Sequence, residues 1–386
     1  MDALMLPSNW QKVRLGDIGK PCMCKRVMKH QTTRYGEIPF YKIGTFGNTA
    51  DAFISKKLFL EYQTKYSFPK KGDILISASG TIGRAVIYDG KPAYFQDSNI
   101  VWIDNDETLV KNDFLFYAYS NVKWNTEHTT ILRLYNDNFK NTLIPLPPLN
   151  EQSAIADILS ALDNYLHALR ALILKKESVK KALSFELLSQ RKRLKGFNQA
   201  WQRVRLGDIA EINPPTIIPN VFYYIDLENV EKGQLLNKQL MTKNKAPSRA
   251  RRLLSKNDIL YQLVRPYQRN NYFFTLNGNY VASTGYAQIR TLQNPSFLYF
   301  ALHSNYFVNA VLDRCEGTSY PAISSNELKK CEVILPPLNE QIAIADILSD
   351  LDRYLHALNS LILKKESVKK ALSHDLMSAK IRVLKK

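Results

Sequence analysis

The strongest constraint in this sequence is an internal repeat that is nearly exact in some segments and almost lost in others. Residues 147–185 and residues 336–374 differ at only six positions. A second pair of matching segments, Trp10–Ile18 and Trp201–Ile209, stands near the start of each half of the chain. Repeats at a fixed separation indicate copies of one structural unit. The chain is therefore expected to follow the order arm, helix, arm, helix.

The two near-identical segments have the pattern of long amphipathic helices. Each starts with two prolines, followed by Asn150 or Asn339 as the expected N-cap and by Glu-Gln in the first turn. Apolar residues then recur at spacings of three and four, and the stripe resumes after a charged interruption at Val179. No Gly or Pro interrupts either segment before Gly196, so each helix can run for about 40 residues, or about 60 Å. The stripe residues expected to pack helix against helix are Ile155, Leu159, Leu162, Leu166 and Leu169 in the first copy and Ile344, Leu348, Leu351, Leu355 and Leu358 in the second.

A helix of this length cannot bury its apolar stripe inside a small domain. It needs a partner helix, and the chain contains one of nearly the same sequence. We expect the two to pack as an antiparallel coiled coil that relates the arms by a pseudo-two-fold repeat. The alternative is that each helix pairs with its counterpart in a second copy of the chain.

The arms are predicted to be mixed domains rich in short strands. Strands are expected at Ile38–Thr45, Asp73–Ser79, Ala85–Gly90 and Ser98–Asp104, where short apolar runs are bounded by Gly, Asp or Pro. Short buried helices are expected at 114–120 and 297–304. Turn positions align between the arms, with Lys70–Gly80 opposite Ser255–Pro266. The fold class is therefore α+β, with two similar mixed α/β arms of one fold that present different surfaces.

The charge balance favours a polyanionic partner. The 386 residues contain 53 Lys and Arg against 35 Asp and Glu, a net charge of +18. An excess of this size attracts nucleic acid through phosphate neutralisation, with an anionic membrane surface as the second possibility. The chain starts without the apolar core of a signal peptide, and no apolar run approaches the roughly 18 residues that a membrane span requires. Its four cysteines show no Cys-x-x-Cys spacing, so we expect a soluble protein of the reducing cytoplasm.

Three short motifs suggest chemistry but lack essential parts. Asn213–Thr216 reads Asn-Pro-Pro-Thr, without the aromatic residue that follows Asn-Pro-Pro in adenine N6-methyltransferases and without a preceding Gly-rich turn for a cofactor. Ser77–Gly83 lacks the Gly-x-Ser-x-Gly order of a nucleophile elbow. Cys22, Cys24 and His30 lack a fourth ligand and the usual zinc spacing. We therefore predict no catalytic residue and no metal site in this chain.

Side chains suited to DNA contact gather in both arms. Lys and Arg neutralise phosphates, Arg can bond guanine through two atoms, and Asn or Gln can do so with adenine. The alternative for each basic stretch is a solvated charged face. The candidates in the first arm are Lys25, Arg26, Lys29, Arg34, Ser77, Ser79, Thr81, Arg84, Gln96, Asn99, Thr129 and Arg133. The candidates in the second arm are Arg249, Arg251, Gln262, Arg265, Arg269, Thr284, Tyr286, Thr318 and Ser319.

The arrangement of the repeats closely resembles the specificity subunit of type I restriction-modification systems. The resemblance covers nearly the whole chain. It is carried by the motif PPLNEQ at 147–152 and 336–341, by the paired segments at Trp10 and Trp201, and by the loop GTSYPAISSNEL at Gly317–Leu328. It implies target recognition domains at 1–146 and 197–335, and helices at 147–196 and 336–386 that act as spacer and docking surface.

The resemblance also implies a division of labour between subunits. Each arm would read one half of a bipartite site in double-stranded DNA. Two methyltransferase subunits would bring S-adenosylmethionine, and restriction subunits would bring ATP- and Mg-dependent cleavage, so this chain would hold no cofactor and catalyse no reaction. Two alternatives stay open at this point: a freestanding adenine N6-methyltransferase that uses Asn213–Pro215, and a coiled-coil scaffold that does not bind DNA.

Overall fold

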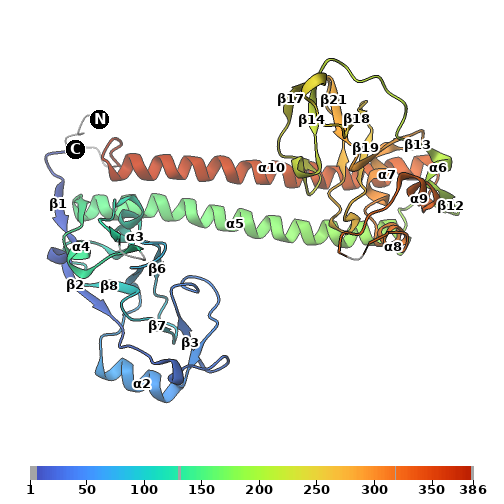
Figure 1. Cartoon of the computed structure of the whole chain (residues 1–386). Coiled ribbons are helices and arrows are strands. Elements are labelled where there is room, and N and C mark those ends of the chain that lie inside the picture. Colours follow the sequence, from blue (N-terminus) through green and yellow to red (C-terminus); the bar gives the residue numbers. More distant parts are fainter. Residues whose placement is uncertain (1–6, 129–131, 318, 384–386) are drawn as a thin grey trace. The chain divides into compact units, whose positions relative to one another are not determined.

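Two long helices and two strand-rich arms make up the computed structural model, which describes residues 7–128, 132–317 and 319–383. The chain divides into two compact units. The first contains Met1–Arg170 and Leu361–Lys386, and the second contains Ala171–Ser360. Each unit thus combines one arm with part of both long helices (Figure 1). None of the helices in the described part of the chain has the length and apolarity needed to cross a membrane.

The long helices have the predicted length. Helix α5 spans Leu149–Leu188 and helix α10 spans Leu338–Met377, each of 40 residues. Both begin two residues earlier than an N-cap at Asn150 or Asn339 would place them. The carbonyl of Pro148 accepts hydrogen bonds from the backbone N–H groups of Glu151 and Gln152, both at 2.9 Å. Asn150 lies inside the first turn, where its side chain accepts from the Glu151 N–H at 2.9 Å, so its predicted N-cap role is wrong, as is that of Asn339.

The helices are antiparallel within each unit. In the first unit, Asp163 pairs with Lys369 and Arg170 pairs with Glu366. As the residue number rises along α5, the number of its partner on α10 falls. The second unit continues this order, with an ion pair between Lys180 and Asp352. The two helices of one chain therefore pair with each other, as expected, and the alternative of pairing with a second copy is not the arrangement found.

Most of the predicted stripe is buried. Leu162 and Leu351 are half-buried, and Val179 is 44% exposed, so the stripe does not resume there as predicted. The apolar face near the start of each helix packs into the core of an arm. The buried stripe residues are Ile155, Leu159, Leu166, Leu169, Ile344, Leu348, Leu355 and Leu358.

A cluster of Trp, Glu and Arg joins the two helix ends to the arm in each unit. In the first unit, the buried Glu151 carboxylate accepts from the Trp10 indole at 3.1 Å and from two nitrogens of Arg382 at 2.7 and 2.9 Å. Arg382 follows the end of α10. Glu151 is in the first turn of α5, where the helix dipole favours its charge.

The second unit contains the same cluster. Glu340 accepts from Trp201 at 3.0 Å and from two nitrogens of Arg193, both at 2.8 Å. Arg193 lies beyond the end of α5, as Arg382 lies beyond the end of α10. The most nearly identical parts of the sequence thus build the same junction twice, which we call the Trp–Glu–Arg cluster.

Each arm has a lobe against the helices and a lobe away from them. In the first arm, the helix-proximal lobe contains the sheet β2-β8-β5-β6 and the pair β1-β11, and the helix-distal lobe contains β4-β3-β7. Its elements are β1 (Gln11–Arg14), α1 (Leu15–Ile18), β2 (Gly19–Met23), η1 (Lys29–Gln31), β3 (Ile38–Tyr41), β4 (Phe53–Ile54), α2 (Lys56–Lys65), β5 (Ile74–Ser77), β6 (Ala85–Ile87), β7 (Tyr94–Phe95), β8 (Ile100–Asn105), α3 (Asn112–Asn121), β9 (Glu127–His128), β10 (Leu132–Arg133), α4 (Asn136–Lys140) and β11 (Leu143–Leu146).

The second arm repeats this topology with additions. Its sheet β13-β22-β19-β20 and pair β12-β23 are helix-proximal, and the sheet β17-β14-β21-β18 is helix-distal. Its elements are β12 (Gln202–Arg205), α6 (Leu206–Ile209), β13 (Ala210–Ile212), β14 (Val221–Ile225), η2 (Leu227–Asn229), β15 (Val230–Glu231), β16 (Gln234–Leu235), β17 (Gln239–Thr242), η3 (Lys243–Lys245), β18 (Ala250–Leu253), β19 (Ile259–Gln262), η4 (Pro266–Gln268), β20 (Tyr272–Phe273), β21 (Tyr280–Ser283), β22 (Tyr286–Thr291), α7 (Pro295–Ala301), α8 (Asn305–Leu312), α9 (Ser325–Lys330) and β23 (Glu332–Leu335).

The shared topology confirms that the arms have one fold. A parallel pair, β3 with β7 or β14 with β21, lies in the helix-distal lobe of each arm. The predicted strands and short helices of the arms are present, although the strands are shorter than expected. The segment predicted as a strand up to Thr45 ends at Tyr41, because Lys42 and Thr45 form a hydrogen-bonded turn.

We expect the Trp–Glu–Arg cluster to dominate the stability of the helix ends. The substitution Arg193→Met removes the charged partner of Glu340, whose side chain is 1% exposed. A buried carboxylate without its partner costs about 3–5 kcal/mol of unfolding free energy. Thermal and denaturant unfolding should measure that loss. The control is Arg353→Met, because Arg353 pairs with Asp350 at 79% and 63% exposure, where about 0–1 kcal/mol is expected; equal losses would contradict the proposed role.

Candidate nucleic-acid interface

Three loops that are predicted from the sequence to contact DNA lie together in the first arm. The loop after β5 contacts the turn before β8, because the Ala78 N–H donates to the Asn99 carbonyl at 2.7 Å. It also contacts the segment before α4, because the Leu134 N–H donates to the Ala78 carbonyl at 2.9 Å. The Ser79 hydroxyl donates to the Asn99 side chain at 2.7 Å, and Ser79 forms an isolated bridge with Arg133. We call this arrangement the three-loop cluster.

The second arm builds the same cluster from different residues. The Leu263 N–H donates to the Gly285 carbonyl at 2.9 Å, and the Ile323 N–H donates to the Leu263 carbonyl at 3.0 Å. Val264 forms the bridge with Ala322 that Ser79 forms with Arg133. The main chain thus has the same hydrogen bonds in both arms, whereas the side chains differ. A cluster of this kind can offer different surfaces on one fixed framework.

The loop after the central strand needs left-handed backbone in both arms. Gly80 has φ +67° and Gly83 has φ +82°. A Cβ atom on Gly83 would lie 2.1 Å from the Trp124 indole nitrogen. In the second arm the position aligned with Gly80 is Arg265, which also has a left-handed φ of +54°. Both loops therefore make a left-handed turn at this position, with a glycine in the first arm and an arginine in the second.

The predicted contacts of the first arm divide into exposed and structural residues. Ser77 and Ser79 are buried, and the Ser77 hydroxyl accepts from the Arg84 N–H at 3.0 Å. The Gln96 side chain accepts from the Ile43 N–H at 3.0 Å, and Asn99 is half-buried. Thr129 lies outside the described residues. The residues with exposed side chains are Thr81, Arg84 and Arg133 at the cluster and Lys25, Arg26, Lys29 and Arg34 on the helix-distal lobe.

The second arm also uses several predicted contacts internally. Tyr286 is fully buried in β22, where burial raises the pKa of its hydroxyl, so it has no surface to offer DNA. Gln262 is buried, and its side-chain amide donates to Gln268 at 3.0 Å. We therefore withdraw Tyr286 and Gln262 as DNA contacts and assign them to the packing beneath the cluster.

The arginines of the second arm differ in how many hydrogen bonds and ion pairs they form within the arm. Arg249 donates to Tyr224 at 3.2 Å and pairs with Asp226, which together raise the pKa of its guanidinium. Arg269 donates to the His303 carbonyl at 2.9 Å and to the Asn305 side chain at 2.7 Å. The residues that present an exposed side chain are Arg251, Thr284 and Ser319, whereas Thr318 lies outside the described residues.

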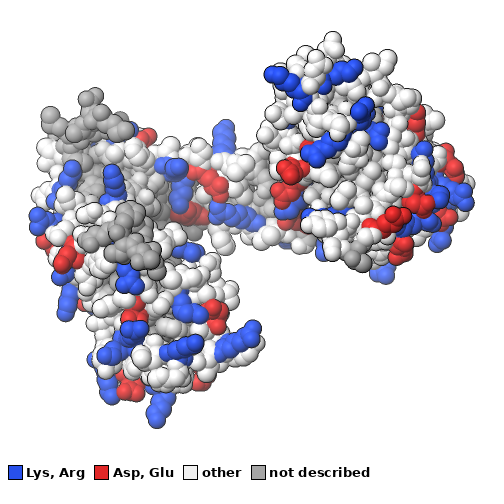
Figure 2. Space-filling view, viewed as in Figure 1, with Lys and Arg blue, Asp and Glu red and all other residues white. Residues whose placement is uncertain are grey.

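Basic side chains also cover the helix-distal lobe of the second arm. Figure 2 shows Lys and Arg gathered over the part of the second unit that holds β14, β17 and β21. Lys238 is held there over the rings of Tyr223 and Tyr280, at 4.7 and 5.5 Å. Half-buried Arg252 has no charged partner among the residues that the structure describes, and burial lowers the pKa of its guanidinium. This lobe can therefore attract a polyanion before any specific contact forms.

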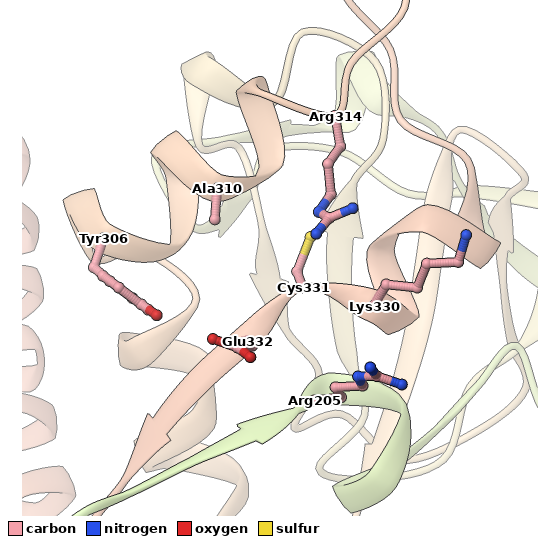
Figure 3. Close-up of a pocket in the computed structure, with 7 residues that line it drawn as sticks. All are labelled: Arg205, Tyr306, Ala310, Arg314, Lys330, Cys331 and Glu332. Carbon is pink, nitrogen blue, oxygen red and sulfur yellow. The ribbon is translucent and has the colours of Figure 1, made fainter.

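A pocket of the second unit lies outside the cluster. Arg205, Arg314 and Lys330 line this pocket of about 450 Å³ together with Tyr306, Ala310, Cys331 and Glu332 (Figure 3). Arg314 and Lys330 both pair with Glu327 beside it. Burial raises the pKa of the Cys331 thiol to about 11, so the thiol is protonated at neutral pH and is a poor nucleophile.

The motifs that suggested chemistry have structural explanations. Asn213 has φ +56°, its side chain donates to the Ser325 hydroxyl at 2.9 Å, and it accepts from the Gln288 N–H at 3.0 Å. It therefore fixes the edge of a sheet. Cys24 is buried and Cys22 is half-buried. In the described ranges, no group of three or more His, Cys, Asp or Glu side chains is placed to hold a metal ion.

The comparison with protein families decides the identity. A model of the type I restriction modification DNA specificity domain matches twice, at residues 7–177 and 198–366. The chain belongs to this family. It is a specificity subunit, which recognises DNA and leaves catalysis to other subunits. Family membership thus favours the predicted function over a freestanding methyltransferase or a scaffold without DNA.

A relative matches this chain over nearly its whole length, and a solved structure shares its fold. The MjaVIII specificity subunit of Methanocaldococcus jannaschii is 26% identical over 99% of this chain and 95% of its own length. A type I restriction enzyme specificity subunit of Haemophilus influenzae is 60% identical over 158 residues, or 41% of each chain. The crystal structure of the type I S subunit from M. genitalium covers 97% of this chain and 98% of its own, with TM-score 0.65 and 18% identity, and so shares the fold.

Sequence reasoning found the three loops but not what holds them together. It aligned Lys70–Gly80 with the second arm and matched the segments before the long helices. The missed residues are Trp124, which packs against Gly83, and Tyr320, which lies against Arg265 at 4.2 Å. No spacing rule in the sequence links Trp124 to Gly83 or Tyr320 to Arg265.

We expect Gly83→Ala in the specificity subunit to be far more damaging than Gly72→Ala. Both glycines have left-handed φ values, +82° and +94°, but only at Gly83 does a Cβ meet another group. The shared backbone strain costs about 1–2 kcal/mol. Gly83→Ala must also displace Trp124 from its packing against Phe139. Unfolding measurements should show the additional loss, and similar losses in the two variants would contradict the role given to Trp124.

Proposed function

We propose that this specificity subunit reads a bipartite site in double-stranded DNA, with one three-loop cluster on each half of the site. The observation that supports this proposal is the equal main-chain framework of the two clusters combined with their unlike side chains. Direct reading of bases requires side chains that reach groove edges from a fixed backbone. Two such frameworks with different side chains would recognise two different half-sites.

The proposed contacts are those side chains that remain exposed or half-exposed. Thr81, Arg84, Asn99 and Arg133 would serve the first arm at the cluster. Thr284, Ser319 and Arg265 would serve the second, and Arg251, on the helix-distal strand β18, would contact a phosphate. Lys25, Arg26, Lys29 and Arg34 lie on a helix-distal lobe and would contact phosphates, which carry no sequence information. Arg249 and Arg269 would orient neighbouring groups, because both are already bonded within the arm.

The long helices would carry the partner subunits and set the distance between half-sites. Their exposed faces repeat apolar residues that no arm covers: Leu174 is 66% exposed and its counterpart Leu363 is 68% exposed. Tyr165 and Tyr354 form a second such pair, at 43% and 44%. Exposed apolar residues mark contact surfaces when they gather. Matched surfaces on two helices would suit two copies of one partner, the methyltransferase subunit.

The remaining parts of the complex follow from this division of labour. Residues 1–146 and 197–335 would be the target recognition domains, and 147–196 and 336–386 the spacer and docking helices. Methyltransferase subunits would bind S-adenosylmethionine, and restriction subunits, joined through the complex, would use ATP and Mg. The working compartment would be the cytoplasm, where the DNA lies and where the four free cysteines stay reduced.

Exchange of the first arm should change one half of the methylated sequence. The replaced segment is 1–146, taken from another family member, with a Trp kept at position 10 so that Glu151 and Arg382 retain their partner. The measurement is a genome-wide map of methylated adenines in cells that express the subunit with its partners. Changes in both halves, or in neither, would overturn the modular assignment.

Affinity for duplex DNA should also fall steeply with salt, because several phosphates are neutralised.

Lengthening both helices together should lengthen the gap between the half-sites. Because α5 and α10 pair side by side, seven residues must be inserted in both, after Arg170 and after Ser360, where the two units meet in sequence. An insertion in α5 alone would shift it against α10 and should lower stability instead. The same methylation map measures the gap, and an unchanged gap in the double insertion would refute the spacer role.

A further inference from the structure

In the second three-loop cluster, Arg265 has a strained backbone conformation, and its guanidinium stacks on an aromatic ring. Within the described residues, that guanidinium donates no hydrogen bond. Arg265 has a left-handed φ of +54° at a position that its repeat partner fills with Gly80. Glycine adopts this conformation freely, whereas a residue with a Cβ adopts it at a cost. Backbone bonds hold it there: the Arg265 N–H donates to the Pro321 carbonyl at 2.7 Å, and its carbonyl accepts from Gln268 at 3.0 Å. A side chain kept where glycine would fit better implies a use for that side chain.

The Arg265 guanidinium is oriented by a neighbouring loop. It lies 4.2 Å from the centre of the Tyr320 ring, and Tyr320 is 64% exposed. Stacking on an aromatic face fixes the plane of a guanidinium and leaves its N–H edge free to donate. The two residues come from two different loops of the cluster, one after β19 and the other before α9. Their contact therefore exists only when the cluster is assembled.

Within the described residues, nothing accepts a hydrogen bond from this guanidinium. That separates it from three other arginines of the arm. Arg249 is paired with Asp226, Arg290 is bonded to Asp258 at 2.9 Å, and Arg269 donates to His303 and Asn305. Tyr320, over which the guanidinium lies, follows exposed Ser319 in a loop predicted to contact DNA. The donors of Arg265 are available to a ligand.

We propose, on the basis of the proposed function, that Arg265 determines a guanine in the half-site of the second arm. A fixed guanidinium edge matches the O6 and N7 acceptors of guanine in the major groove, and no other base presents that pair of acceptors there. Tyr320 is a positioning residue that holds the guanidinium plane. The first arm has Gly80 at this place, so its half-site receives no base preference from this position.

The test variant is Arg265→Gly, which gives the second arm the residue that the first arm already has. The strained position is then relieved, so folding should not suffer, and unfolding measurements check this. Methylated-adenine maps of cells that carry the subunit with its partners should show one guanine of the second half-site relaxed to other bases. Discrimination at that position should fall by about 10- to 100-fold. The half-site read by the first arm should stay unchanged.

A base analogue gives a second, independent readout. Duplexes with 7-deazaguanine at the relaxed position lack the N7 acceptor. The wild-type subunit should bind them more weakly than normal duplexes, whereas Arg265→Gly should bind both equally. Tyr320→Ala should give an intermediate loss for the normal duplex, because the guanidinium is then mobile. Arg251→Ala is the matched control, since loss of an exposed arginine used for phosphate contact lowers affinity for all sequences alike.

The outcomes separate this assignment from the proposed function. If Arg265→Gly keeps the full base preference, or if the wild-type second half-site contains no guanine, the guanine assignment is wrong. Exchange of the first arm would still alter one half-site in that case, and the proposed function would stand. If arm exchange alters neither half-site, the proposed function itself fails.

Discussion

A buried carboxylate at the start of each long helix holds the molecule together. Glu151 and Glu340 are almost inaccessible, and an unpaired charge there would be very costly. Each is satisfied by an indole from the start of its arm and by an arginine from beyond the end of the opposite helix. One charge thus joins three segments that are far apart in sequence. The two halves of the chain satisfy this requirement with the same three residue types.

The arms have different constraints. Their three-loop clusters depend on main-chain hydrogen bonds, which form whatever the side chains are. They also depend on a left-handed turn that Gly80 and Arg265 both adopt. Side chains on such a framework can change without loss of the fold. A fixed junction with variable loops is the physical form that a modular reader of DNA sequence would require.

Sequence reasoning succeeded where long-range periodicity determines structure and failed where local hydrogen bonds do. Forty residues without Gly or Pro predicted the helices and their pairing. The first carbonyl acceptor was missed because Pro148 replaces the expected Asn150, and Val179 is exposed because the stripe turns away from the partner helix. Tyr286 was predicted to contact DNA because of its hydroxyl group, but β22 is buried on both faces from Tyr286 to Ile289. Polarity alone does not separate a contact residue from a buried support.

The division into two units has a consequence for how the chain folds during synthesis. The second unit is one continuous segment, Ala171–Ser360, whereas the first also needs Leu361–Lys386. Leu376 and Met377 belong to the core of the first arm, and Arg382 completes its buried charge. The arm made first is therefore the arm completed last. The apolar residues of the first arm therefore stay exposed while the second unit folds. Chaperones would bind these exposed residues until the C-terminal segment is synthesised.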